Sequence, residues 1–169
     1  MRKNFTVEEL TQVMYAAADA CLKSHGEMFP DKVYYAFGIE TYAIYGYFHM
    51  ALNTHEDFDE YAASCREMNI SDSAIENEKW NNPQSWKYFD FNGHNNAWND
   101  TWADKEKEIF KFIEDMQDED NDTALDVFCD VFKQAGVNTL ALLKKRNSFK
   151  HIHTTKDFKT IVYEHNDVF

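Results

Sequence analysis

The feature that most constrains this fold is a stretch dense in aromatic and β-branched residues at positions 32–52. It consists of two runs, KVYYAFGIE and YAIYGYFHMAL, which meet at a break near Glu40 and Thr41. Runs of this kind on either side of a break predict an antiparallel β-hairpin. Apolar side chains in the first run fall on both faces of the strand, so we expect both faces to be covered and the hairpin to lie at the centre of a sheet.

Amphipathic helices are predicted on both sides of this hairpin in the sequence. Thr6 and Glu9 form a capping-box pattern ahead of a helical apolar spacing, and Gly26 is expected to end that first helix. The predicted helices cover residues 6–24, 55–68, 96–116 and 122–136, the last one beginning at Asp122 or Thr123 and ending at Gly136. Residues 137–143 fit either a second short helix or a strand.

Two further strands are predicted, at residues 86–91 (WKYFDF) and 148–154 (SFKHIHT), and residues 69–83 are predicted as a polar loop. The final TIVYEH run fits a strand or a helix end. No repeat or flexible linker divides the chain, so we expect a single α+β domain over residues 1–169. In this domain a central antiparallel sheet, made of hairpin 32–52, strand 86–91 and a C-terminal strand, is packed by several amphipathic helices.

Net charge narrows the choice of partners. The 169-residue chain has 30 Asp and Glu against 17 Lys and Arg, a formal net charge of −13. Nucleic acids and anionic membranes bind mainly through Lys and Arg, so we expect neither as a partner, and a basic protein instead. No apolar run has the length of a signal peptide or a membrane span, and three widely spaced cysteines are typical of buried free thiols. A cytoplasmic location is therefore expected.

The acidity is concentrated in one run. It holds six carboxylates in nine positions: Glu114, Asp115, Asp118, Glu119, Asp120 and Asp122. Its DxDxD spacing is similar to a calcium loop, but Thr123 and Cys129 stand where an EF-hand needs Gly and a bidentate Glu. The run is either a solvated turn between helices or a recognition surface for a basic partner, and the second hypothesis is the one to test.

Charge is also segregated along the chain. Residues 103–130 carry a net charge of −8 and the first 143 residues −16, whereas residues 144–169 carry +3. This distribution predicts an acidic surface for a basic partner, with a basic C-terminal segment beside or opposite it.

Histidines near the C-terminus support an alternative. His151 and His153 are two residues apart, so on a strand both imidazoles would point to one face, and His165 could complete a metal site. HxH pairs are common, however, and no third ligand has a fixed spacing to this one. We therefore expect a surface or structural role and no cofactor. The alternative is a small metal-binding protein or metal-dependent enzyme that uses these histidines.

Motifs for catalysis are missing from the sequence. It contains neither a GxSxG elbow nor a Gly-rich phosphate loop, and carboxylates are too numerous for any pair to be informative. We therefore expect no enzymatic activity and no catalytic residue. The four tryptophans, Trp80, Trp86, Trp98 and Trp102, are predicted to lie mostly in the core, with the remainder available to an interface.

The order of these features resembles a bacterial domain-of-unknown-function family of small acidic α+β proteins. The hairpin sequence YYAFGIETYAIYGYFHMALNT is followed by WNNPQSWKY, a loose match to the family's W-S-P-x-x-W-x-Y segment, and VFKQAG begins the C-terminal part. KHIHTTKDF replaces a more apolar segment of that family. In general character such proteins are similar to immunity proteins of the SUKH group, which are encoded beside bacterial polymorphic toxins. The resemblance implies a fold built on these aromatics and supplies no catalytic residue.

The function expected from the sequence is that of a non-enzymatic cytoplasmic binding protein, specifically an immunity protein that neutralises a cognate toxin domain through its acidic surface. A metal-binding protein or metal-dependent enzyme is the first alternative, and a structural or adaptor protein is the second. The sequence leaves the oligomeric state open.

Overall fold

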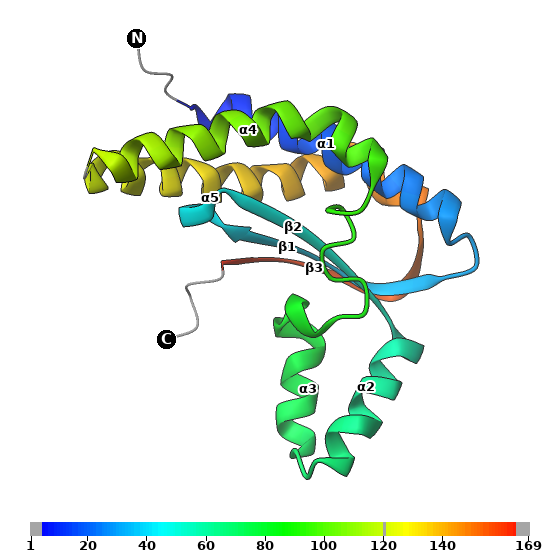
Figure 1. The fold of residues 1–169 in the computed structure, drawn as a ribbon. Coiled ribbons are helices and arrows are strands. Elements are labelled where there is room, and N and C mark those ends of the chain that lie inside the picture. Colours follow the sequence, from blue (N-terminus) through cyan, green and yellow to red (C-terminus); the bar gives the residue numbers. More distant parts are fainter. Residues whose placement is uncertain (1–4, 120, 165–169) are drawn as a thin grey trace.

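A three-stranded mixed β-sheet separates two groups of helices in the computed structural model, which describes residues 5–119 and 121–164 (Figure 1). The strands are β1 (Val33–Tyr42), β2 (Tyr47–Thr54) and β3 (His153–Glu164), and they lie in the order β2-β1-β3. Helices hold 65% of the residues and strands 19%, which confirms the predicted α+β class.

The predicted hairpin is confirmed, with its turn a few residues later than expected. β1 and β2 pair antiparallel and are joined by the short 3₁₀ helix Ala43–Tyr45. Gly46 then takes a left-handed φ of 70°, and a Cβ on it would come within 2.5 Å of the Ile109 side chain. The turn therefore depends on a glycine for both its backbone conformation and its contact with a helix.

The sheet is mixed, not antiparallel as predicted, because β3 pairs with β1 in parallel. α5 (Asp122–Lys145) runs along the sheet and returns the chain to the end where β1 begins, so that His153 lies opposite Val33. A strand that starts at the same end as its neighbour must run parallel to it. β1 is therefore the central strand, and β2 and β3 are the two edges.

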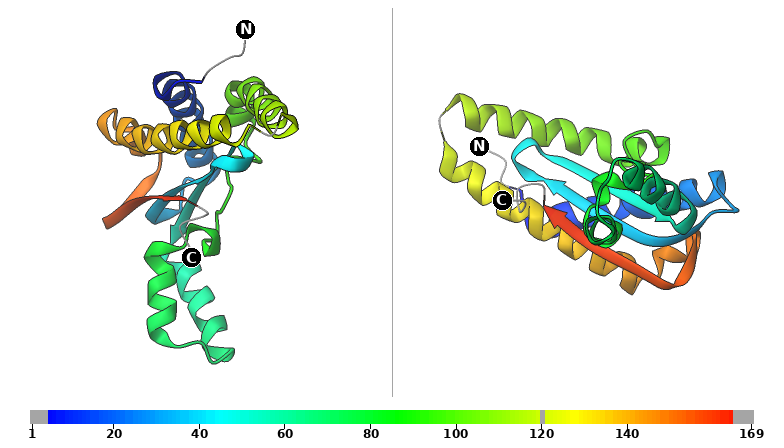
Figure 2. Two further views of the ribbon diagram at one scale, coloured as in Figure 1. Left: turned by 90° about the vertical axis from the view of Figure 1, so that its left-hand side faces the viewer. Right: turned by 90° about the horizontal axis from the view of Figure 1, so that it is seen from below.

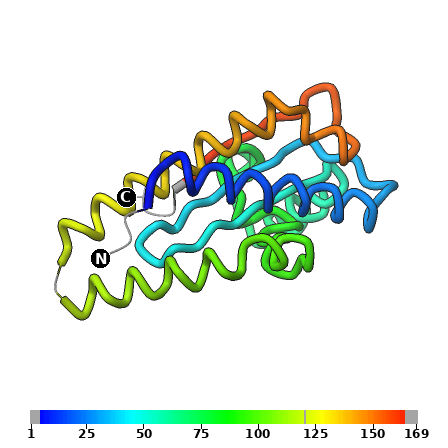
Figure 3. Tube along the Cα trace, turned by 90° about the horizontal axis from the view of Figure 1, so that it is seen from above, coloured from blue at the N-terminus to red at the C-terminus, as the bar shows by residue number. Residues whose placement is uncertain are grey.

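Three long helices cover one face of the sheet. α1 (Val7–Met28) lies between α4 (Asn96–Asp118) and α5, and this arrangement is clearest from above (Figure 3). Their buried side chains pack with the upper side of β1 and β2 into the larger hydrophobic cluster, which includes Trp98 and Trp102. The expectation that the tryptophans lie mostly in the core is confirmed for these two and for Trp86, which is 4% exposed.

Two glycines expected to end helices lie inside them. α1 continues through Gly26 to Met28, and α5 continues through Gly136 to Lys145. A Cβ on Gly26 would lie 1.9 Å from the carbonyl oxygen of His151, and one on Gly136 would lie 2.7 Å from Cγ2 of Thr41. Both glycines therefore permit close packing of a helix against another segment. The prediction that they end helices was wrong because it considered only the local backbone.

A helical hairpin projects from one end of the opposite sheet face (Figure 2). Its helices are α2 (His55–Glu67), which was predicted, and α3 (Asp72–Asn81), which lies in the segment predicted as a polar loop. Ser71 caps α3 by accepting a hydrogen bond from the amide of Ala74 at 3.3 Å. The loop prediction was wrong because α3 is polar on nearly all sides and buries only Ile75.

The segment predicted as a third strand, residues 86–91, forms only one isolated bridge, between Tyr88 and Leu52. It passes along the outer edge of β2, where the side chain of Asn92 takes the place of a strand. The Asn92 amide accepts a hydrogen bond from the Met50 amide at 2.6 Å and donates one to the Phe48 carbonyl at 2.9 Å. Asn92 therefore closes the β2 edge without a further strand.

The C-terminal strand begins later than predicted. Residues Ser148–His151 form the short 3₁₀ helix η3, and the strand itself begins only at His153. Asn147 starts this turn with a φ of 57°. The ambiguous segments are thereby assigned: residues 137–143 belong to α5, and the TIVYE part of the last run belongs to β3. His165 lies outside the described residues.

Candidate functional site

The acidic run lies at the turn that joins α4 to α5, at one end of the molecule (Figure 3). All five of its described carboxylates are exposed: Glu114, Asp115, Asp118, Glu119 and Asp122. Asp120 lies outside the described residues. The structure therefore brings the described part of the predicted recognition surface together on one exposed helical tip, which we call the acidic tip.

Local capping positions these acids. Asn121, and not Asp122 or Thr123 as predicted, caps α5 by accepting a hydrogen bond from the Ala124 amide at 3.2 Å. Asp122 is therefore free to face solvent in the first turn of α5, where the helix dipole favours a negative charge.

An apolar groove opens beside the acidic tip. It consists of two adjoining hollows of about 470 and 520 Å³ that share the side chains of Phe5, Phe112 and Met116. Ala124, Val127 and Val131 of α5 extend the lining on one side, and the Val127 residue is 60% exposed. Large exposed apolar side chains next to a charged rim are typical of interaction sites. The sequence reasoning missed this groove because it needs two helices and the N-terminal segment to come together.

The Phe5 side chain packs between α4 and α5 and lines the groove. Its ring lies edge-on to Phe112 and to Phe128, with centroid distances of 5.5 Å in each case. Below it, Lys105 donates hydrogen bonds to Glu9 of α1 and Glu108 of α4, both at 2.7 Å, and only 13% of its side chain is exposed. The Lys105 contacts hold α1 against α4, and the Phe5 ring contacts both α4 and α5, so the groove is preformed.

The rim of the groove carries both signs of charge, with acids in excess. Lys111 donates to Asp115 at 2.9 Å, and this hydrogen bond raises the pKa of the Lys111 ammonium. Lys107 pairs with Asp104 at 3.2 Å. Lys111 thus pairs with one acid of the tip and Lys107 with a carboxylate outside it, so the tip keeps an excess of negative charge in the field that a partner meets.

The two candidate metal ligands in the described part of the chain, His151 and His153, belong to different elements. His151 lies in η3, half-buried, with Nε2 3.8 Å from Oδ1 of Asp19, whereas His153 is exposed at the start of β3. The expectation that both point to one strand face was wrong because His151 precedes the strand. Within residues 5–119 and 121–164, no group of three His, Cys, Asp or Glu side chains could hold a metal ion.

A polar cluster that the sequence reasoning missed lies on the sheet face opposite α1, α4 and α5. His49 Nδ1 and Asp90 Oδ1 are 2.8 Å apart, and Asp90 has a left-handed φ of 54°. A Cβ on Gly93 would come within 2.6 Å of the Asp90 carboxylate, so a larger residue there would displace this side chain. The Asn92-Gly93 turn signal marks the loop, but only the fold places Asp90 against His49.

Glu40 lies next to this pair. It stands directly opposite His49 in the β1–β2 ladder, is 2% exposed and accepts a hydrogen bond from the Gln84 side chain. The exposed rings of Tyr45 and Tyr47 continue the same region, with centroids 6.4 Å apart. Chemically, this arrangement offers an oriented imidazole, carboxylates and tyrosine rings, a set suited to hydrogen bonding.

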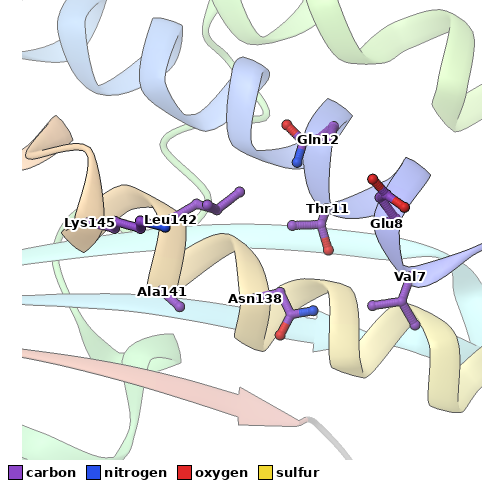
Figure 4. A pocket seen from close by; sticks show the side chains of 8 residues that line it. All are labelled: Val7, Glu8, Thr11, Gln12, Asn138, Ala141, Leu142 and Lys145. Atoms are coloured by element: carbon purple, nitrogen blue, oxygen red, sulfur yellow. The ribbon is translucent and has the colours of Figure 1, made fainter.

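A third hollow of about 460 Å³ lies between α1 and α5, and its eight lining side chains come equally from the two helices (Figure 4). Val7, Ala141 and Leu142 give it apolar walls, while Glu8 and Lys145 lie towards its two ends. The lining contains apolar, amide and oppositely charged groups, so it does not indicate one class of ligand.

No family model, curated protein or solved structure matches this chain. None of the helices in the described part is both long and apolar enough to cross a membrane. The fold and the geometry therefore define an α+β protein with a preformed apolar groove under an acidic helical tip.

Proposed function

We propose that this protein is a non-enzymatic binding protein that recognises a basic protein partner through the acidic tip and its groove. The observation that carries this proposal is that exposed carboxylates border a preformed apolar groove between α4 and α5. Interfaces commonly combine an apolar centre, which supplies most of the affinity, with a polar rim, which supplies specificity and speeds association.

We further propose that the partner is a toxin domain and that the protein acts in the cytoplasm as its immunity protein. Two observations support this. The hairpin and WNNPQSWKY segments resemble a family of small acidic proteins similar in character to immunity proteins, and the net charge of −13 complements a basic domain. An immunity protein of this kind needs no catalytic residue, because occlusion of the toxin is sufficient.

The surface is tested with an amphipathic Leu/Lys peptide of about 18 residues, a length that suits a helix in a groove. Asp118→Asn/Glu119→Gln/Asp122→Asn should weaken binding at least about tenfold and flatten its salt dependence. The matched control, Asp59→Asn/Glu60→Gln/Glu67→Gln, removes the same charge from exposed positions of α2 and should change little. Calorimetry at several salt concentrations gives both quantities. Equal losses in the two variants would contradict recognition at the tip.

The groove is tested separately. Val127→Ser should weaken binding of the same peptide by roughly fivefold to tenfold, because a partly buried apolar contact is lost. Val137→Ser is the control, since Val137 is also an exposed valine of α5 and lies outside the groove lining. If Val137→Ser has the same effect, the groove is not the binding surface.

The biological role is tested by co-expression in a bacterial host with the basic C-terminal domain of any large secreted protein encoded immediately upstream. Growth rescue by the wild-type protein, and its loss in the acidic-tip variant, are the expected results. Killing that the wild-type protein does not relieve would overturn the immunity role. Stoichiometric zinc, manganese or iron in the purified protein that is lost on His151→Ala would favour the metal-binding alternative.

A further inference from the structure

β3 is an edge strand with an open outer side. It pairs with β1 alone, and the views in Figures 1 and 2 show no other element beyond it. Residues 153–164 make no backbone hydrogen bond to any other described segment. The pairing with β1 shifts register between Thr154 and Lys159 and is regular from Lys159 to Glu164. Along this regular part, the alternate N–H and C=O groups that point away from β1 can accept a further strand. β2, in contrast, has its outer edge closed by Asn92.

The chemistry along this edge is basic, in contrast to the rest of the surface. Lys144, Lys150 and Lys156 are exposed, and none forms an ion pair with a residue of the described ranges. Lys159 is exposed as well, with its ammonium 4.1 Å from the ring centroid of Trp80. Two acids belong to β3: Asp157, which lies 3.5 Å from His55 Nε2, and Glu164, its last residue, so the four lysines remain in excess.

A hollow of about 370 Å³ lies at the same edge. Phe149, Phe158 and Thr160 form its apolar lining, and Lys144 and Lys159 border it. The rings of Phe149 and Phe158 are 5.2 Å apart, edge to face. A docked strand would present every second side chain to this face, so the hollow can take one apolar side chain while the lysines meet the residues that flank it.

We propose that an extended acidic segment of a partner protein adds to β3 as a fourth strand, with an apolar side chain in the hollow and carboxylates at the lysines. This surface is distinct from the acidic tip and has the opposite charge, so the proposal goes beyond the function argued above. Lysines on an edge strand repel basic strands and disfavour neutral ones, which would desolvate the ammonium groups without a counter-charge, so an acidic strand is selected. A second copy is disfavoured because pairing of β3 with itself would bring the same lysines together.

The probes are three acetylated ten-residue peptides: one alternates Glu with Val and Thr, one has Lys in place of Glu, and one is the acidic peptide with alternate N-methyl amides. The acidic peptide should bind at least about tenfold more tightly than the basic one. N-methylation should also abolish most of the binding, because it removes the hydrogen bonds of an added strand. Equal binding of the N-methylated peptide would overturn strand addition.

Amide hydrogen exchange locates the peptide. Alternate amides of β3 should be protected on binding, and protection confined to another element would overturn the proposal. Lys144→Glu/Lys156→Glu should weaken binding of the acidic peptide at least about tenfold. Lys23→Glu/Lys87→Glu is the matched control, since both lysines are exposed and belong neither to β3 nor to the lining of its hollow. Equal effects of the two double variants, or self-association of the wild-type protein through β3, would contradict the assignment.

Discussion

At the scale of single residues, His25 is a buried titratable group in the large core. Its side chain lies 2.8 Å from the Tyr34 hydroxyl through Nε2, and the residue is 2% exposed. The rings of Phe29, Tyr88 and Phe91 surround it at centroid distances from 4.6 to 5.4 Å. Burial in this aromatic cage lowers the pKa of His25 from 6.5 to about 4, since the cage disfavours the charged imidazole.

This burial makes the folded state sensitive to acid. As the pH falls, the unfolded chain takes up a proton on His25 near pH 6.5, whereas the folded protein does so only near pH 4. The contribution of His25 to the free energy of unfolding is therefore fully present above pH 6.5 and is lost as the pH falls towards 4, with a slope of up to about 1.4 kcal/mol per pH unit. Urea unfolding of the wild-type protein and of His25→Gln between pH 7 and pH 4.5 checks this. The variant should show a shallower pH dependence, and identical slopes would contradict it.

At the scale of elements, the two edges of the sheet differ in whether their outer backbone groups are hydrogen-bonded. The β2 edge is closed by backbone hydrogen bonds to Tyr88 and Phe91 and by two hydrogen bonds of the buried Asn92 side chain, whereas β3 stays open. This asymmetry follows from chain order, because the segment after α3 must pass β2 on its way to α4. The only edge free for a partner strand is thus the one that the C-terminal segment supplies, within the described part of the chain.

Asn92→Ala should destabilise the protein by about 2 to 4 kcal/mol. It removes two buried hydrogen bonds and leaves the Met50 amide and the Phe48 carbonyl without this partner. Asn99→Ala, at an exposed site of α4, should change the free energy of unfolding by less than about 1 kcal/mol. Chemical denaturation of both variants measures the difference. A cost below that of Asn99→Ala would show that Asn92 does not seal the edge.

At the scale of the whole molecule, the side chains form two hydrophobic clusters of unequal size. The larger one joins α1, α4 and α5 to the sheet, and the smaller one joins α2 and α3 to the opposite face around Tyr35 and Trp86. The projecting α2–α3 hairpin buries few side chains of its own, chiefly Phe58, Ala62 and Ile75. Elements with few buried contacts open at lower free energy than the rest of a fold.

The α2–α3 hairpin should therefore unfold locally before the rest of the protein. We expect its amides to be at least about 30-fold less protected from hydrogen exchange than those of α1, equivalent to about 2 kcal/mol. Ile75→Ala should lower protection in α2 and α3 further and leave α1 unchanged, because Ile75 belongs to the smaller cluster alone. Native-state exchange measures both. Equal protection of α1 and α3 in the wild-type protein would contradict a separately opening hairpin.

Interactions between near neighbours in the sequence were the ones that could be predicted. Thr6 caps α1 by accepting from the Glu9 amide, and Thr54 caps α2 by accepting from the Asp57 amide, each three residues ahead. The β-hairpin, the amphipathic α4 and the exposed position of the acidic run follow likewise from local period and polarity. For the site, the sequence predicted which carboxylates would be exposed, but not the groove beside them.

The sequence alone thus determined the α+β class, the β1–β2 hairpin and the acidic character of the α4–α5 turn, because period, capping and charge act over a few residues. The hairpin was expected at the centre of the sheet, but only β1 is central, because β3 pairs with it and leaves β2 at an edge. Tertiary structure decided the rest: the parallel β3, the packing roles of Gly26 and Gly136, the groove around Phe5 and the pairing of His49 with Asp90. Each of these depends on contacts between segments far apart in the chain. A local sequence pattern does not indicate which distant segment will pack against it.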